Sequence, residues 1–256
     1  MQTARQTGWM VVRQARNLMR EPIWIAMMII QPMIWLLLYG QLFSKVTSLR
    51  AGAGTYVEFL TPGVVCMNAF FGGTWAGMAM INDLDRHVVD RFLAAPASRL
   101  AIVLSQVVRA GLTAILQAIV LLLVGLALGV RVHGGALGWL VVLAAAFLLA
   151  MVFAGFSNGI ALLLRREASM IASANFVSLP LMFLSSILVA TALMPGWIRA
   201  IARFNPVNWG VLASRNAVVT GGDWGHSSLY LLFLLAAVTA TSLFATWCFR
   251  SYQRSI

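Results

Sequence analysis

Long apolar runs separated by short polar segments dominate this chain. Six runs are long enough to cross a membrane as helices, and they cover residues 23–43, 59–81, 102–130, 137–164, 170–193 and 229–249. A spanning helix needs about 20 predominantly apolar residues, because it crosses about 30 Å of hydrocarbon at about 1.5 Å per residue. The runs are too long and too uniformly apolar for the alternating strands of a membrane barrel. The pattern therefore predicts an all-α integral membrane protein with six transmembrane helices.

A helical period also precedes the first apolar run. Apolar residues between positions 11 and 19 share one face, and the remaining positions include three arginines, Arg13, Arg16 and Arg20. We predict an amphipathic interface helix within residues 1–22, lying on the inner membrane surface with its arginines near anionic lipid. Charge that only sets the topology is the alternative. Residues 23–256 would then form the six-span domain.

The largest charge cluster follows the second apolar run. Its charged, histidine and aromatic members are Asp83, Asp85, Arg86, His87, Asp90, Arg91 and Phe92. We expect Asp83 to cap a short helix, because acidic residues suit the first turn, and we expect Pro96 to end it. The helix would lie parallel to the membrane on the cytoplasmic side. A solvated loop is the alternative, but the apolar patch formed by Val88, Val89 and Phe92 favours an interface with a partner.

The fifth apolar run leads into a short amphipathic helix. Polar, proline and tryptophan residues mark this passage: Ser185, Ser186, Pro195, Trp197, Arg199, Arg203, Asn205 and Pro206. We expect Pro195 to open the helix and Asn205 with Pro206 to close it. Trp197 falls on its apolar face, and the two arginines, four residues apart, fall on the other. So short a helix cannot span a bilayer. We predict that it lies at the outer interface and caps a path between spans.

Composition and charge agree with this picture. Hydrophobic residues make up 61% of the chain and charged residues 10%. The net charge of +11 does not indicate nucleic-acid binding, because the basic residues stand singly or in pairs between the spans. With six spans both termini lie on one side, which holds twelve of the eighteen Lys and Arg residues. The excess of basic residues in cytoplasmic loops therefore predicts that both termini are cytoplasmic.

The sequence lacks the residues of several other functional classes. No acidic residue lies in the middle of a predicted span, which disfavours a carrier driven by protons or sodium. His87, His133 and His226 lie in different loops and form no metal-ligand cluster. The single lysine, Lys45, does not follow a glycine-rich phosphate-binding pattern. If ATP powers transport here, another polypeptide must bind it.

With these features the chain resembles the ABC-2-type permease family, the membrane subunits of ATP-binding-cassette exporters. Within that family it is most similar to the daunorubicin-resistance type of drug-exporter permease. The resemblance covers nearly the full length. Its most specific elements are Leu179-Pro180, Phe183-Leu184-Ser185, Pro195-Gly196-Trp197 and Asn205-Pro206, together with Pro96-Ala97-Ser98-Arg99 after the charged segment. Ser186 departs from the glycine that many relatives carry after the serine.

The resemblance implies a division of labour between chains. The segment from Asp83 to Phe92 would be the coupling helix, seated on a separate P-loop ATPase subunit that is present in two copies and binds ATP and Mg. This chain would carry no cofactor of its own. A second copy or a paralogue would complete the path, and the stretch from Ser185 to Pro206 would form its outer gate. The substrate would be hydrophobic or amphipathic, and the location a bacterial cytoplasmic membrane. Export of lipid-linked polysaccharide and a non-transporting assembly role are the alternatives.

Overall fold

The computed structural model describes residues 22–46, 53–85, 99–221 and 223–253, and within these ranges every regular element is helical. The α-helices are α2 (Pro22–Leu42), α3 (Tyr56–Thr74), α4 (Ala76–Asp85), α6 (Arg99–Ala127), α7 (Gly135–Leu164), α8 (Glu167–Phe183), α9 (Gly196–Ala202), α10 (Pro206–Arg215) and α11 (Trp224–Gln253). A 3₁₀ turn, η2 (Thr191–Leu193), precedes α9, and a π-helical turn, η3 (Asn216–Thr220), continues α10. The expected all-α architecture is therefore confirmed for the described part of the chain.

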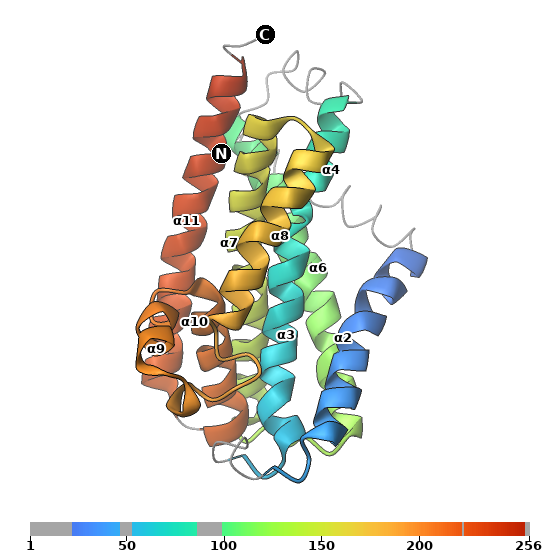
Figure 1. The fold of residues 1–256 in the computed structure, drawn as a ribbon, viewed down its shortest axis with the longest axis vertical. Helices are drawn as coiled ribbons and strands as arrows, with labels where there is room; N and C mark the ends of the chain where they lie inside the picture. Colours follow the sequence, from blue (N-terminus) through green and yellow to red (C-terminus); the bar gives the residue numbers. More distant parts are fainter. Residues whose placement is uncertain (1–21, 47–52, 86–98, 222, 254–256) are drawn as a thin grey trace.

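Four helical stretches are long and apolar enough to cross a membrane: Tyr56–Asp85, which combines α3 and α4, Ile102–Ala127, Gly135–Leu164 and Trp224–Ser251. They correspond to the second, third, fourth and sixth predicted spans. Helix α2 has nearly the bounds predicted for the first span, and it lies at the right of the bundle (Figure 1).

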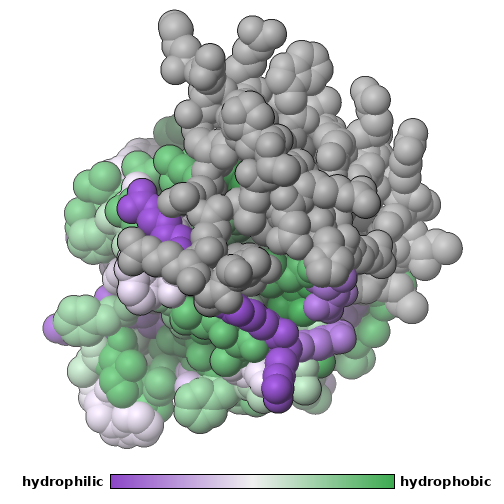
Figure 2. Space-filling view, turned by 90° about the horizontal axis from the view of Figure 1, so that it is seen from above, coloured by the Kyte–Doolittle hydropathy of each residue, from purple (hydrophilic) through white to green (hydrophobic). Residues whose placement is uncertain are grey.

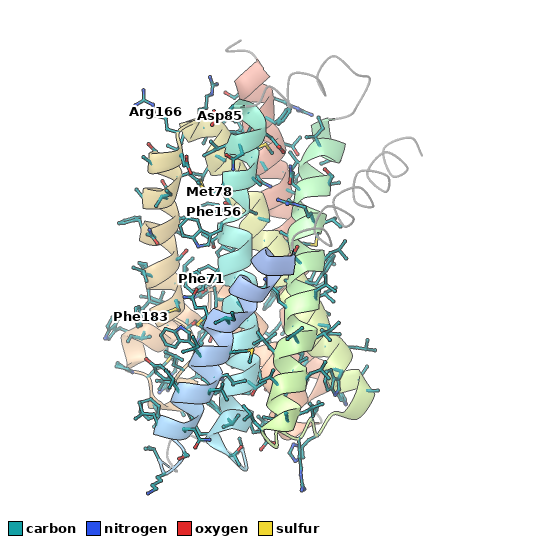
Figure 3. The ribbon with its side chains drawn as sticks, turned by 90° about the vertical axis from the view of Figure 1, so that its right-hand side faces the viewer. Phe71, Met78, Asp85, Phe156, Arg166 and Phe183 are labelled. Atoms are coloured by element: carbon teal, nitrogen blue, oxygen red, sulfur yellow. The ribbon has the colours of Figure 1, made fainter. Side chains whose placement is uncertain are left out.

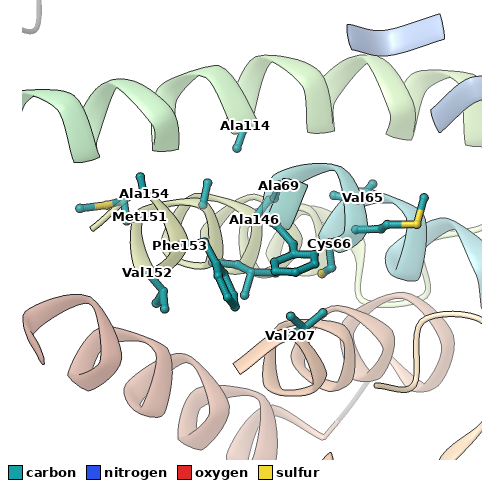
Figure 4. Close-up of a cluster of buried hydrophobic side chains, with 14 of the residues drawn as sticks. Val65, Cys66, Ala69, Ala114, Ala146, Met151, Val152, Phe153, Ala154 and Val207 are labelled. Carbon is teal, nitrogen blue, oxygen red and sulfur yellow. The ribbon is translucent and has the colours of Figure 1, made fainter. Parts of the chain in front are cut away.

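Helix α7 lies at the centre of the bundle and contacts α3, α4, α6, α10 and α11 (Figure 1). Glycines permit the closest of these approaches. A Cβ at Gly73 would lie 2.5 Å from the carbonyl oxygen of Ala150 on α7, and a Cβ at Gly155 would lie 2.8 Å from Oγ1 of Thr241 on α11. Small residues let membrane helices pack backbone to backbone, because lipid supplies no hydrophobic force between them. The core around α7 includes Phe153, whose ring packs against Phe70 of α3 (Figure 4).

The fifth predicted span is wrong in its extent. We expected a continuous span over residues 170–193, but α8 ends at Phe183. Its 17 residues measure about 25 Å, which is short of the roughly 30 Å of a hydrocarbon core. The chain then continues without regular helix from residue 184 to residue 190. The reason is that side chains far along the sequence bind the backbone here, as described below.

The upper end of the bundle in Figure 1 carries Asp85 at the end of α4 and Arg166 just before α8, both labelled in Figure 3. A view from above shows strongly hydrophilic side chains among hydrophobic ones at this end (Figure 2). The predicted interface helix, with Arg13, Arg16 and Arg20, lies outside the described residues, as do Arg86, His87, Asp90, Arg91 and Phe92 of the predicted coupling helix.

One expectation for the charged segment is corrected. Asp83 does not cap a new helix but lies in the last turn of α4, which ends at Asp85. Its carboxylate oxygen Oδ2 accepts a hydrogen bond of 2.8 Å from Nε2 of Gln106 on α6. This hydrogen bond attaches the end of α4 to α6, so Asp83 stabilises the packing of the two helices.

Candidate functional site

The segment that follows α8, residues 184–190, is mostly buried but forms no regular helix. Pro180 lies in the last turn of α8 and has no N–H to donate to the preceding turn. The Ser185 hydroxyl donates a hydrogen bond of 2.6 Å back to the Met182 carbonyl. Both features weaken the helix end locally. They do not explain why the chain stays unwound, since each backbone group that leaves a helix needs another partner in an apolar surrounding.

Two asparagines at the start of α10 provide several of these partners. Asn205 Nδ2 donates to the carbonyls of Leu181 at 2.7 Å and Leu184 at 3.0 Å, while its Oδ1 caps α10 by accepting from Val207 N. Asn208 Oδ1 accepts from both N and Oγ of Ser186, at 3.0 and 2.6 Å. Each amide therefore satisfies backbone groups on both sides of the turn, which fixes α10 to the end of α8.

Arg215, at the end of α10, supplies the third set of contacts. It is 8% exposed, and its Nη2 donates to the carbonyls of Ser186 at 2.8 Å and Ile187 at 3.3 Å. The guanidinium carbon lies 3.7 Å from the centre of the Phe59 ring on α3. A buried cation needs such partners, because water no longer solvates it. Asn208 and Arg215 are seven residues apart, which is two helical turns, so both reach the same segment.

Helix α3 closes the other side of the segment. The Tyr56 hydroxyl donates to the Leu188 carbonyl at 3.2 Å. A Cβ at Gly63 would lie only 2.5 Å from the Ile187 carbonyl oxygen, so only glycine leaves room for this backbone crossing. We name this set the polar clamp. It comprises the side chains that bind the unwound backbone, the glycine that makes room for it, Ser186 within it and Phe59 beside the Arg215 guanidinium. Its members are Tyr56, Phe59, Gly63, Ser186, Asn205, Asn208 and Arg215.

The short helix α9 lies outside the polar clamp. Pro195 precedes it as the N-cap residue, as expected, and Trp197 is 64% exposed. Arg199 Nη2 donates to the carbonyls of Ala192 and Met194, both at 3.1 Å, and so holds η2 against α9. The Arg203 carbonyl accepts from Trp209 Nε1 at 2.7 Å. The amphipathic helix after Pro195 was therefore predicted well, but Asn205 and Pro206 do more than close it, because they begin α10.

A second polar contact joins three segments at the same end. His133, between α6 and α7, places Nδ1 3.1 Å from Glu58 Oε1 and 3.1 Å from the Val218 carbonyl of η3. The Glu58 side chain is 6% exposed, and its Oε2 accepts from Gly54 N at 2.9 Å. Backbone bonds from His133 N to Val218 O and from Gly134 N to Ala217 O add to the contact. This end of the bundle is thus fixed by polar bonds.

Sequence reasoning found only part of the polar clamp. It selected Ser185, Ser186 and Asn205, which the structure brings together, and Trp197 and Arg203, which lie at the surface. It missed Tyr56, Phe59, Gly63, Asn208 and Arg215. The signal that could have found Arg215 is its spacing of seven residues from Asn208 within an otherwise mainly apolar helix. Among the described residues no group of three potential metal ligands comes together.

Proteins with similar sequences are membrane permeases. Residues 5–219 match the family described as ABC-2 type transporter. The putative transport permease ycf38 of Cyanophora paradoxa is 31% identical over 205 residues, which cover 78% of this chain and 69% of that protein. The daunorubicin resistance ABC transporter permease protein DrrB1 of Streptomyces coeruleorubidus is 26% identical over 238 residues, 91% of this chain and 80% of that protein.

Proposed function

Because this chain belongs to the ABC-2 type transporter family, we propose that it is the membrane half of an ATP-driven exporter that moves a hydrophobic or amphipathic substrate out of the cytoplasm or the inner leaflet. The membrane domain of this family carries no catalytic ATPase site and no cofactor, and the chain is a multi-pass membrane permease. ATP and Mg would therefore bind to a separate P-loop subunit. We place the protein in a bacterial cytoplasmic membrane with both termini inside, as the charge distribution favours.

The polar clamp carries this proposal. Unwound backbone at membrane depth is tolerated only where protein groups satisfy it or where it lines a cavity, and broken helices commonly mark the transport path. Here side chains from α3 and α10 satisfy five carbonyls around the break, those of Leu181, Leu184, Ser186, Ile187 and Leu188. We assign this segment and α9 as the outer gate, closed in the observed arrangement.

The gate assignment is tested in proteoliposomes that contain the permease and its ATPase subunit. Asn208→Leu removes the bonds to Ser186 without changing a charge, and we expect loss of drug-stimulated ATP hydrolysis and of daunorubicin efflux. Asn158→Leu is the matched control, because Asn158 is buried on α7, lies outside the polar clamp, and has no hydrogen-bond partner for its amide among the described residues. Normal efflux by Asn208→Leu would remove the gate from the proposal.

The opposite end would receive the ATPase. Asp85 is exposed where α4 ends, and the charged residues from Arg86 to Phe92 follow it. The double charge reversal Asp85→Arg with Arg86→Asp should weaken co-purification with the ATPase, because complementary charges set register at such contacts. Arg250→Asp on α11 is the control at the same end. Equal recovery of the ATPase with both variants would contradict the assignment of this segment as the coupling helix.

A second copy of the chain would complete the path along α8. This helix is attached through one stripe of buried residues, Met170, Ala174, Ser178 and Met182. Its other face exposes Asn175 together with Phe176, which is 80% exposed, and Phe183, which is 66% exposed (Figure 3). An exposed amide in the middle of a membrane helix favours a protein neighbour over lipid.

Cysteine cross-linking tests this contact. In a background where Cys66 and Cys248 are replaced by alanine, Phe176→Cys should form a disulfide between two copies. Leu243→Cys on α11 is the control, since this leucine is 65% exposed and belongs to a different helix. Cross-linking through Leu243→Cys and not through Phe176→Cys would place the second copy on another face.

The substrate class rests on composition and on one relative. The spans hold few polar groups, which disfavours a water-soluble cargo, and the Streptomyces relative is named for daunorubicin resistance. Lipid-linked polysaccharide is the alternative cargo, and a non-transporting assembly role is the alternative function. Stimulation of ATP hydrolysis by daunorubicin supports a drug as the substrate, and stimulation by a lipid-linked glycan supports polysaccharide export. If neither compound stimulates hydrolysis and no efflux is seen, the non-transporting assembly role is supported.

A further inference from the structure

The second span is broken in its middle, between α3 and α4. Helix α3 ends at Thr74 and α4 begins at Ala76, with Trp75 between them. A helix end leaves carbonyls without partners, and a helix start leaves N–H groups without partners. Met78 N uses the Trp75 carbonyl at 3.1 Å. The Thr74 carbonyl and the Gly77 N–H find their partner on another helix.

That partner is one hydroxyl, Ser157 of α7. Its Oγ donates to the Thr74 carbonyl at 2.5 Å and accepts from Gly77 N at 2.9 Å. Ser157 is 2% exposed, so water does not compete for these bonds. A single side chain thus satisfies one end of each half-helix.

Glycines place α7 close enough for this contact. A Cβ at Gly77 would lie 2.5 Å from Ser157 Oγ and 2.7 Å from its carbonyl oxygen, and a Cβ at Gly73 would lie 2.5 Å from the Ala150 carbonyl oxygen. Both halves of the second span therefore rest on α7 on either side of the break. Met78 lies above the break and Phe71 below it, on the side that faces α8 (Figure 3).

The two halves of the second span, α4 and α3, lead to opposite ends of the bundle. Helix α4 ends at Asp83 and Asp85, where the ATPase would dock, and α3 begins with Tyr56, Phe59 and Gly63 of the polar clamp. We infer that the break at Trp75 is a hinge and that Ser157 is the positioning residue that holds its two halves together. Movement of α4 then reaches the outer gate through α3 only while the Ser157 hydroxyl is in place. The coupling of α4 to the outer gate rests on the proposed function, whereas the hinge depends only on the contacts between the helices.

Hydrogen–deuterium exchange tests the hinge without any transport assay. In lipid nanodiscs, Ser157→Ala should speed exchange of the Gly77 amide and its neighbours in α4 by about ten-fold, because the N–H loses its acceptor. Ser178→Ala is the matched control: Ser178 is 3% exposed, and its hydroxyl has no hydrogen-bond partner in the part of the chain that the structure describes. Exchange in Ser157→Ala equal to that of the wild type would overturn the hinge.

Coupling is tested with the ATPase subunit present. Ser157→Ala should retain the ATPase and its basal turnover but lose several-fold of the daunorubicin-stimulated turnover and of efflux. Gly77→Ala should act in the same direction by displacing Ser157, whereas Gly72→Ala should not, since its Cβ would meet nothing closer than 3.9 Å. Wild-type stimulation in Ser157→Ala would overturn the positioning role. If the wild-type protein shows neither stimulation nor efflux with daunorubicin or with a lipid-linked glycan, the proposed function fails, and exchange alone decides whether Ser157 holds the hinge.

Discussion

Replacing Arg215 by methionine should open the polar clamp without unfolding the bundle. The substitution keeps a long apolar side chain beside Phe59 but removes the donor to the Ser186 and Ile187 carbonyls, which lie 2.8 and 3.3 Å from Nη2. Each buried carbonyl left without a partner costs about 1–3 kcal/mol, and the lost cation–π contact adds about 0.5–2 kcal/mol. Relief from burying a charge offsets several kcal/mol of that sum. The net loss is about 2 kcal/mol.

Cys66 reports this opening directly. Its thiol is fully buried, and Sγ lies 3.5 Å from Oγ of Ser214, the neighbour of Arg215. A thiol-reactive dye should therefore label Cys66 only when the polar clamp opens. A loss of about 2 kcal/mol corresponds to roughly thirty-fold faster labelling, because each 1.4 kcal/mol is a factor of ten. The measurement uses a Cys248→Ala background, so that only one thiol remains.

Two controls separate local opening from general destabilisation. Cys248 is also fully buried but lies near the far end of α11, so its labelling, measured in a Cys66→Ala background, should not change. Arg203→Met removes an exposed arginine outside the polar clamp and should leave Cys66 labelling at the wild-type rate. If Arg215→Met labels Cys66 within about two-fold of the wild-type rate, the energetic reasoning is refuted. Equal acceleration at both thiols would refute its local character.

Two further predictions follow from the same end of the bundle. Gly63→Ala should displace the Ile187 backbone and lower the free energy of unfolding by about 1–3 kcal/mol. Gly196→Ala should leave this free energy unchanged, because a Cβ there meets open space. Thermal unfolding in nanodiscs compares the two variants. A hydrogen bond from His226 holds the pKa of Asp223 below its usual value. The ionised Asp223 therefore stabilises the start of α11 above about pH 4, and this stabilisation is lost as the pH falls through the folded-state pKa. The Tm difference between wild type and Asp223→Asn should thus shrink as pH falls below about 4, and a difference that persists at low pH would contradict this.

The long helices could be predicted from the sequence because length and apolar content decide them. Helices α3 with α4, α6, α7 and α11 all lie close to the predicted spans. The end of α8 could not be predicted, since residues 170–193 read as one apolar run, and the bonds that stop the helix come from Asn205 and Arg215, more than twenty residues away. The break at Trp75 escaped for the same reason, because its partner Ser157 is 80 residues from Gly77.

The same distinction explains why Arg215 was not among the predicted site residues. A sequence pattern shows that residues 206–215 can form a helix, but it does not show that the helix folds back into the bundle. Burial of Arg215 depends on Phe59 and on carbonyls that exist as free acceptors only because α8 has already ended. Each feature requires the other, so neither has a local signature. Local rules predict elements that are stable by themselves and fail at elements that stabilise each other.

The two attachments of the fifth span differ in physical kind, and this difference decides where a conformational change can be abrupt. Helix α8 rests on its neighbours through Met170, Ala174, Ser178 and Met182, and such dispersion contacts lose energy gradually as surfaces slide. The segment below it is held by hydrogen bonds of 2.6–3.3 Å to Asn205, Asn208 and Arg215, which are either made or broken. Opening there leaves several buried polar groups unpaired at once, so partial opening costs nearly as much as complete opening. The outer segment should therefore switch between two states, while α8 can shift by degrees.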